Sequence, residues 1–166
     1  MTEPTPRVWV GCLAAYNAGT LHGEWVDVEG MDAEDLYQAI LDVLKSSPEP
    51  GAEEWGFFDH EDLPGIGEYS AVEDVIETAE LVNKYPIALV TGVLANGIKL
   101  AELGEWLGDR SYGHYESRAE YAQEYHEGAP EHPLDGYIDW DAVGRDLLMD
   151  AIEIDAPDGG IYVVHY

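Results

Sequence analysis

Acidic residues gather toward both ends of this chain and leave a stretch near its middle without any. Residues 1–80 hold nineteen acids and two bases, and residues 102–166 hold sixteen acids and three bases. Residues 81–101 hold two bases and no acid. We interpret this neutral, largely apolar stretch as the packing centre of a middle segment, flanked by two parts whose like charges oppose compact folding.

The overall charge limits the partners that the protein can bind. Thirty-five acids against seven Lys and Arg give a net charge of −28. Nucleic acid and anionic membranes repel such a protein, whereas basic proteins, including the clefts of DNA-binding proteins, attract it. Cys12 is the single cysteine, which excludes an intrachain disulfide, and its apolar neighbours predict a buried thiol. With neither a basic-then-apolar leader nor a membrane-length apolar run, we expect a soluble, cytoplasmic protein.

The first sixty residues have the pattern of two strands, a helix and a third strand. Apolar and β-branched residues over 8–15 and 23–28 predict a β-hairpin around the turn residues 17–20. Asp32 stands where it can cap a helix. The buried stripe of that helix is predicted at helical spacing: Leu36, Ile40, Val43 and Leu44. Aromatic residues over 54–59 then predict the third strand.

The middle of the chain predicts three short helices. The sequence Ser-Ala-Val-Glu at 70–73 has the spacing of a capping box, which opens a helix running to about residue 83. Pro86 fits the first turn of a second helix, and Asn-Gly at 96–97 ends it. A third helix follows over 98–107.

The last part of the chain mixes strands and helices. We expect a strand over 109–115 and a helix opened by a second capping box at 117–120, running to about Glu127. A later helix has a partial apolar face: Val143, Leu147, Leu148 and Met149. Residues 154–164 predict a closing hairpin around the turn 157–160.

These elements predict an α+β protein, an elongated chain of three small domains. The first, 1–60, is the ββαβ unit, the second, 61–108, is helical, and the third, 109–166, is mixed with a terminal hairpin.

Several of the acids recur at helical spacing. Glu116, Glu120, Glu124, Glu127 and Glu131 step by three or four residues, as do Glu73, Glu77 and Glu80. On a helix each step rises roughly 5–6 Å, close to the charge repeat along one DNA strand. Like charges so placed cost about 0.2–0.5 kcal/mol per pair, a cost that interspersed lysines normally remove. Arg118 is the only base between Ser111 and Asp141.

Stretches from both ends resemble one protein family. YIDWDAVGRDLL, with a hairpin ending GGIYVV, resembles the C-terminal signature of the ArdA antirestriction proteins, which mimic DNA. The resemblance continues in RVWVGCLAAYNAGTLHGEWVDVE, SPEPGAEEWGFFDHEDLPG and GEYSAVEDVIETAELV. It covers nearly the whole chain and is weakest over 84–106.

The resemblance implies a non-enzymatic inhibitor of type I restriction-modification enzymes, which acts as a homodimer joined through its C-terminal domain. Genes of this family typically travel on mobile elements. No catalytic, cofactor or metal residue is expected. The acids expected to form the DNA-mimicking surface are Glu73, Glu77, Glu80, Glu116, Glu120, Glu124, Glu127, Asp135, Asp139 and Asp141. The residues expected in the core or in a dimer interface are Tyr137, Trp140, Leu147 and Leu148.

Two other classes compete with this interpretation. The first is an acidic binding module for another basic protein, with a charge that is partly an adaptation to concentrated salt. This alternative predicts acids on every exposed face. A metal-dependent enzyme could use residues 59–62 (Asp-His-Glu-Asp), His114, His126 or His132, but their spacing fits no zinc or EF-hand pattern. Nucleophilic catalysis lacks a motif, since Cys12 lies in an apolar strand and no G-x-S-x-G is present.

Overall fold

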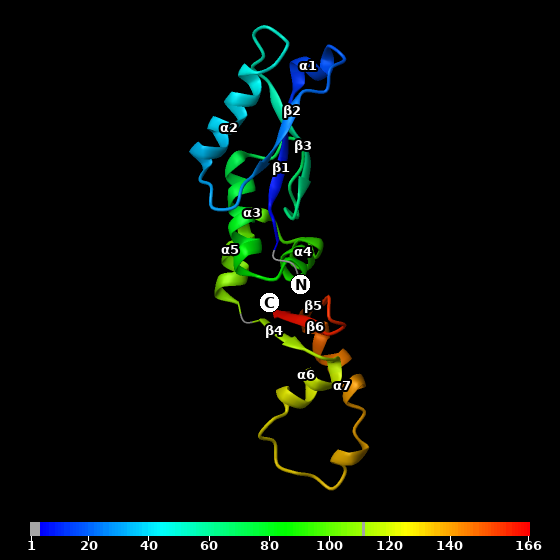
Figure 1. Ribbon diagram of the computed structural model, residues 1–166. Helices are drawn as coiled ribbons and strands as arrows, with labels where there is room; N and C mark the ends of the chain where they lie inside the picture. The colour runs from blue at the N-terminus through cyan, green and yellow to red at the C-terminus, as the bar shows by residue number, and fades with distance from the viewer. Residues whose placement is uncertain (1–3, 111) are drawn as a thin grey trace. The chain divides into compact units, whose positions relative to one another are not determined.

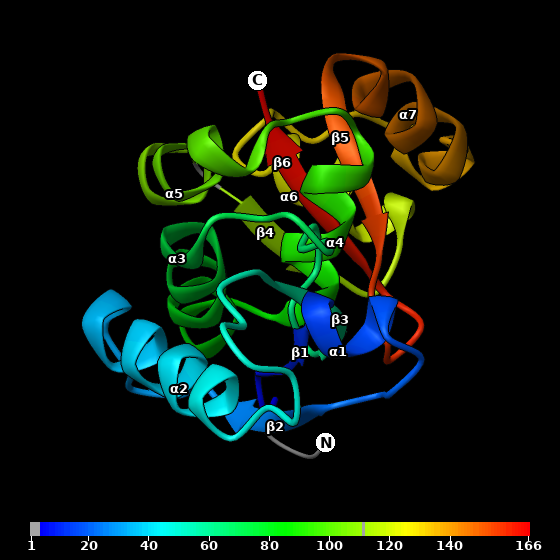
Figure 2. The ribbon, with the colours of Figure 1, turned by 90° about the horizontal axis from the view of Figure 1, so that it is seen from above.

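The computed structural model describes residues 4–110 and 112–166 (Figures 1 and 2). Within them the chain forms seven α-helices and two antiparallel three-stranded sheets, which confirms the α+β class. The chain divides into two compact units between Val90 and Thr91, inside one helix. The division into three domains at residues 60 and 108 stays a prediction.

The N-terminal unit contains the expected ββαβ arrangement with one addition. Its elements are β1 (Arg7–Cys12), α1 (Leu13–Asn17), β2 (Gly23–Asp27), α2 (Ala33–Lys45), β3 (Trp55–Glu61), α3 (Val72–Lys84) and the first half of α4 (Ile87–Ala95). The strand order is β2-β1-β3. The strand predicted over 8–15 is too long, because the chain turns into α1 after Cys12 and reaches β2 through that short helix.

One face of this sheet forms the core of the unit. Val8, Val10 and Cys12 alternate along β1 and are fully buried, so the predicted burial of the thiol is confirmed. Helix α2 packs against β1 and β2 and also contacts α3. Its predicted stripe is buried throughout, and Asp32 caps it by accepting the Asp35 N–H while the Asp35 carboxylate accepts the Asp32 N–H. This reciprocal capping satisfies two of the amide groups that a helix leaves free at its start.

Helix α3 begins one residue later than the capping box predicts. Its N-cap is Ala71, and no side chain caps it. Ser70 instead uses its hydroxyl to accept the Gly67 N–H, and its own N–H donates to the Gly67 carbonyl. Ser70 therefore stabilises the preceding turn, so the first predicted capping box is wrong.

The C-terminal unit is built around the second sheet. Its elements are α5 (Leu100–Asp109), β4 (Tyr112–Tyr115), α6 (Arg118–Tyr125), the 3₁₀ turn η1 (Asp135–Tyr137), α7 (Trp140–Leu147), the 3₁₀ turn η2 (Leu148–Asp150), β5 (Ala151–Asp155) and β6 (Ile161–His165). The strand order β4-β6-β5 makes β6 central. Four consecutive β6 residues, 161–164, are buried, as expected for a strand covered on both faces.

Helices cover β6 on the face where Ile161 and Val163 point. These two residues form a buried cluster with Tyr121 of α6 and Leu148 of η2, and Leu147 packs against it. Met149, predicted on the same apolar face, is 80% exposed. The helix ends at Leu147 and tightens into a 3₁₀ turn, which takes Met149 off the helical stripe and into solvent.

The closing hairpin forms as predicted, with its turn fixed by Asp158. The Asp158 carboxylate accepts the Gly160 N–H at 3.1 Å, and that bond, followed by the contact with His114, holds the pKa of Asp158 below its ordinary value. Gly159 has a φ of +92°, which L-residues with side chains rarely adopt.

No single helix of the described chain has the length and apolarity to cross a membrane. Helices α4 and α5 reach that length and composition only together, and they are bent by 120° relative to each other.

Candidate functional site

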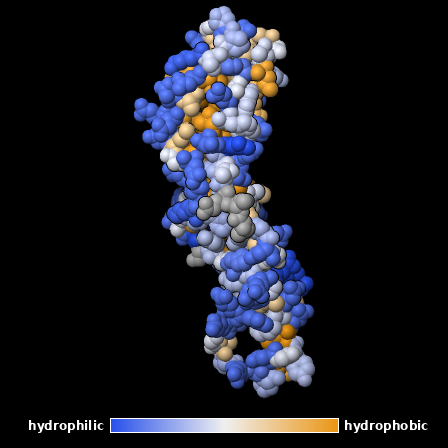
Figure 3. All heavy atoms as spheres, viewed as in Figure 1, coloured by the Kyte–Doolittle hydropathy of each residue, from blue (hydrophilic) through white to orange (hydrophobic). Residues whose placement is uncertain are grey.

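The carboxylates lie at the surface in both units. Of the acids that the structure describes, thirty are exposed and four are half-buried, and none is buried. The half-buried ones are Glu49, Asp74, Glu77 and Glu153. Figure 3 shows hydrophilic side chains over most of this face of each unit, with apolar side chains gathered near α1 and beside α2. The negative charge is therefore almost fully available to a partner.

Few of these carboxylates are neutralised by the protein's own bases. Within the described residues, four acids pair with Lys or Arg: Glu61 with Arg7, Asp42 with Lys45, Glu153 with Arg118, and Asp146 with Arg145. A fifth, Asp158, contacts His114. Exposed charges without a counter-charge keep their field for an approaching cationic surface.

Helix α3 carries the first predicted acidic stripe. Glu73 and Glu80 are exposed and Glu77 is half-buried, so all three lie on one helix away from its buried residues. The opposite side of α3 is apolar and buried, as predicted: Val72, Val75, Ile76, Ala79 and Val82. Packing therefore fixes the orientation of the stripe.

The second predicted stripe is not one helix face. Helix α6 ends at Tyr125, so only Glu120 and Glu124 lie on it. Glu116 precedes the helix, Glu127 follows it in a turn, and Glu131 lies in irregular backbone. Gly128 stops the helix by taking a φ of +87°, and Pro130 cannot continue it. The acids of segment 116–141 are exposed, but loops position half of them.

The field of these acids reaches a neighbouring tyrosine. Burial raises the pKa of Tyr115, and the nearby carboxylates of Glu124 and then Glu120 raise it further. Arg118, the one base within the segment, points its guanidinium at Glu153, 2.7 Å away, so that base is already engaged.

Three of the predicted surface acids also hold local structure. Asp139 caps α7 by accepting the Ala142 N–H, and Asp135 accepts the His132 N–H. Ser117 caps α6, but Glu120 accepts the N–H of Glu116 rather than that of Ser117, so the second capping box is shifted by one residue. These acids keep their charge exposed while they fix the loops around them.

The four candidates for core or interface separate in the structure. Leu148 is buried in the core cluster, and the half-buried Leu147 packs against it. Trp140 is half-buried, at the start of α7. Tyr137 is 85% exposed and is the one member of the four that lies fully at the surface.

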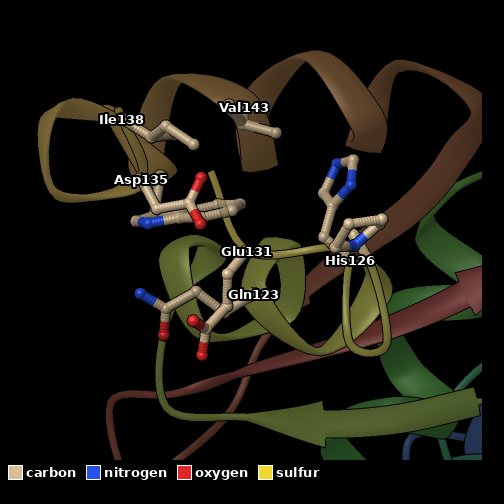
Figure 4. Close-up of a pocket in the computed structure, with 9 residues that line it drawn as sticks. Gln123, His126, Glu131, Asp135, Ile138 and Val143 are labelled. Carbon is tan, nitrogen blue, oxygen red and sulfur yellow. The ribbon is translucent and has the colours of Figure 1, made fainter. Parts of the chain in front are cut away.

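Segment 123–143 also encloses a pocket that the sequence does not reveal. Its volume is about 600 Å³. The lining residues are Gln123, His126, Ala129, Pro130, Glu131, Asp135, Ile138, Trp140 and Val143. In Figure 4 Ile138 and Val143 come from the side of α7, the Asp135 carboxylate lies below Ile138, and the Glu131 side chain extends toward Gln123 of α6. A 14-residue connection brings these residues together, and no periodicity signals such a fold.

The candidate metal ligands are dispersed or otherwise engaged. Across residues 4–110 and 112–166, no three His, Cys, Asp or Glu side chains gather closely enough to hold a metal ion. Glu61 pairs with Arg7, Asp62 accepts the Thr5 N–H, and His132 accepts the Leu134 N–H. The described residues thus offer a charged surface as the candidate site.

Comparison with known proteins identifies one family. A search of curated proteins gives no match. The model of the antirestriction protein family ArdA matches residues 8–160 of the chain's 166, a range that holds all ten acids predicted to form the DNA-mimicking surface and stops just before β6. The protein therefore belongs to the ArdA family of antirestriction proteins.

Proposed function

We propose that this protein blocks type I restriction-modification enzymes by presenting carboxylates in place of DNA phosphates. The observation that carries the proposal is the state of the acids. Thirty of them are exposed, and only four of all those described pair with the protein's own Lys or Arg. Such a surface is complementary to the basic groove of a DNA-binding enzyme.

The expected mechanism is electrostatic replacement. A DNA-binding protein gains much of its affinity from Lys and Arg contacts that release counterions from phosphates. Carboxylates held on folded elements, such as Glu73 and Glu80 on α3, can make the same contacts with little loss of conformational entropy. The inhibitor supplies no phosphodiester to cut and no base to methylate, so it occupies the groove without being a substrate.

The acids proposed to act are the ten named from the sequence, and they act collectively. Each exposed contact contributes roughly 0–1 kcal/mol, so no single carboxylate dominates. In this proposal the protein acts by binding alone, without a cofactor or a catalytic residue. Its place of action would be the cytoplasm, where incoming DNA meets restriction enzymes, and its gene would suit a mobile element.

We also infer that the protein forms a homodimer through its C-terminal part. Exposed large apolar side chains support this: Leu134, Tyr137 and Met149 are 59%, 85% and 80% exposed. Leu148 contributes little to such a surface, because its side chain is buried in the core cluster.

Competitive kinetics test the proposal. With a purified type I enzyme, the inhibitor should raise the DNA concentration that gives half-maximal cleavage and leave the maximal rate unchanged, because it and DNA occupy the same groove. The measurement is initial cleavage rate against DNA concentration at several inhibitor concentrations. A fall in the maximal rate that added DNA does not restore would contradict competition for the groove.

A further inference from the structure

Backbone hydrogen bonds fix two turns of the segment 123–143 that lines the pocket. The chain leaves α6 at His126, where the Ala129 N–H donates to the His126 carbonyl. It returns through η1, where the Tyr137 N–H donates to the Leu134 carbonyl. The pocket has a volume of about 600 Å³, which falls within the range of ligand pockets, roughly 300–1,000 Å³.

The walls of this pocket combine an apolar surface with two carboxylates, the Gln123 amide and the imidazole of His126, whose ring centroid lies 5.8 Å from that of the Trp140 ring. Ile138, Val143 and the half-buried Trp140 supply the apolar part. Glu131 and Asp135 supply the charge, and no Lys or Arg is among the lining residues that the structure describes. Asp135 uses one oxygen, Oδ2, to accept the His132 N–H at 2.8 Å, which fixes the direction of its carboxylate.

From these residues we propose that the pocket takes an arginine side chain of the target enzyme, as an anchor among the distributed charge contacts. The planar guanidinium can stack on an indole and donate paired hydrogen bonds to a carboxylate. Its aliphatic stem fits walls such as Ile138 and Val143. This proposal rests on the proposed function, because DNA-binding enzymes present arginines for phosphate contacts.

Other occupants match the lining less well. An apolar side chain would take water from two carboxylates without replacing their hydrogen bonds, which is costly. An anionic group would be repelled by the same carboxylates. Lysine has the right charge but is a strongly hydrated point charge that cannot stack its head group as guanidinium does.

A peptide titration tests the pocket without the target enzyme. The probe is acetyl-Gly-Arg-Gly-amide, and its control carries citrulline, which is neutral and nearly the same shape. Observed by NMR on the full chain, the Arg peptide should shift the Trp140 indole N–H in a saturable way, with the citrulline peptide at least tenfold weaker. Trp140→Phe assigns the signal. Equal responses to the two peptides would overturn the proposal.

Matched variants separate the pocket from general charge. The double variant Glu131→Gln/Asp135→Asn keeps an oxygen at each position and removes two charges. Its control, Glu105→Gln/Asp150→Asn, removes two exposed charges of the same unit away from the pocket. The pocket variant should weaken Arg-peptide binding about tenfold, and the control less than twofold. Equal weakening of Arg-peptide binding by both variants would overturn the proposal that the pocket binds arginine.

The same variants distinguish failure of the pocket from failure of the proposed function. In the cleavage assay the pocket variant should raise the half-inhibitory concentration about tenfold, and the control about threefold or less. Equal losses would overturn the anchor and leave the distributed charge mechanism in place. If the wild-type protein did not inhibit, the proposed function would fall, and the peptide titration would still decide whether the pocket binds arginine. If the Arg peptide did not bind and the pocket variant changed the sedimentation of the protein, the arginine proposal would fall. The pocket would then be assigned to an interface with a second copy of the chain.

Discussion

Replacing four exposed acids of segment 116–141 by lysine should raise the half-inhibitory concentration against a type I enzyme by about a hundredfold or more. Each exposed ion contact contributes roughly 0.2–1 kcal/mol, and reversal replaces each attraction with a repulsion of similar size. The best set is Glu116, Glu124, Glu127 and Asp141, which are exposed and cap no helix. The measurement is a dose–response curve for cleavage.

The choice of these four keeps the fold intact. Glu120, Asp135 and Asp139 are left unchanged, because their carboxylates accept backbone N–H groups. Circular dichroism and the melting temperature should match the wild-type protein. Single Glu→Gln changes at the same sites should shift the half-inhibitory concentration by about threefold or less. A single such change that eliminated inhibition in a folded protein would disprove the distributed mechanism.

Gly144→Ala should destabilise the C-terminal unit by about 1–3 kcal/mol and lower its melting temperature by roughly 5–20 °C. A Cβ at Gly144 would lie 2.2 Å from the carbonyl oxygen of Arg118 and 2.7 Å from its carbonyl carbon. These are backbone atoms at the start of α6, so they cannot rotate away. Helices α6 and α7 would have to separate, which would disturb the core at Leu148 and the pocket between them.

Gly108→Ala is the matched control for this substitution. Gly108 is also a helical glycine of the same unit, but a Cβ there meets nothing within 4 Å. Alanine should therefore stabilise α5, by up to about 1 kcal/mol, because it loses less conformational entropy than glycine. Thermal unfolding of both variants measures the effect. Equal melting temperatures for the two variants would show that the close approach of α7 to α6 does not limit the side chain at position 144.

Gly144 also shows what the sequence resemblance alone leaves unexplained. It lies inside YIDWDAVGRDLL, the stretch that resembles the family signature, yet nothing in the spacing of that stretch requires a glycine. The structure supplies the reason, which is the contact with Arg118. Gly144 therefore serves helix packing rather than charge.

Patterns that depend on neighbouring residues were predicted well from the sequence. The stripe of α2 and its Asp32 cap follow from helical spacing and capping chemistry, and both are present. The turn at Asp158 and Gly159 follows from the needs of a tight turn. The class of fold follows from the order of these elements.

Patterns that depend on distant residues were predicted poorly. Ser70 fits a capping box locally, but its hydroxyl accepts the Gly67 N–H instead. A single stripe of all five glutamates would need α6 to continue through Gly128, but the helix ends at Tyr125. The pocket arises from a connection folded between α6 and α7, and its Trp140 could be assigned from sequence only to a core or an interface.

Direct displacement of DNA from a type I enzyme, measured across a salt series, tests the central claim. The purified protein is titrated against the enzyme bound to a fluorescently labelled target duplex, between about 50 and 200 mM salt. The account predicts displacement at low salt, with the inhibitor's affinity for the enzyme falling steeply and linearly on logarithmic axes, as affinities built on charge contacts do. Absence of displacement at low salt, with the protein folded, would contradict DNA mimicry. It would favour an acidic module for another basic partner, with a charge adapted to concentrated salt.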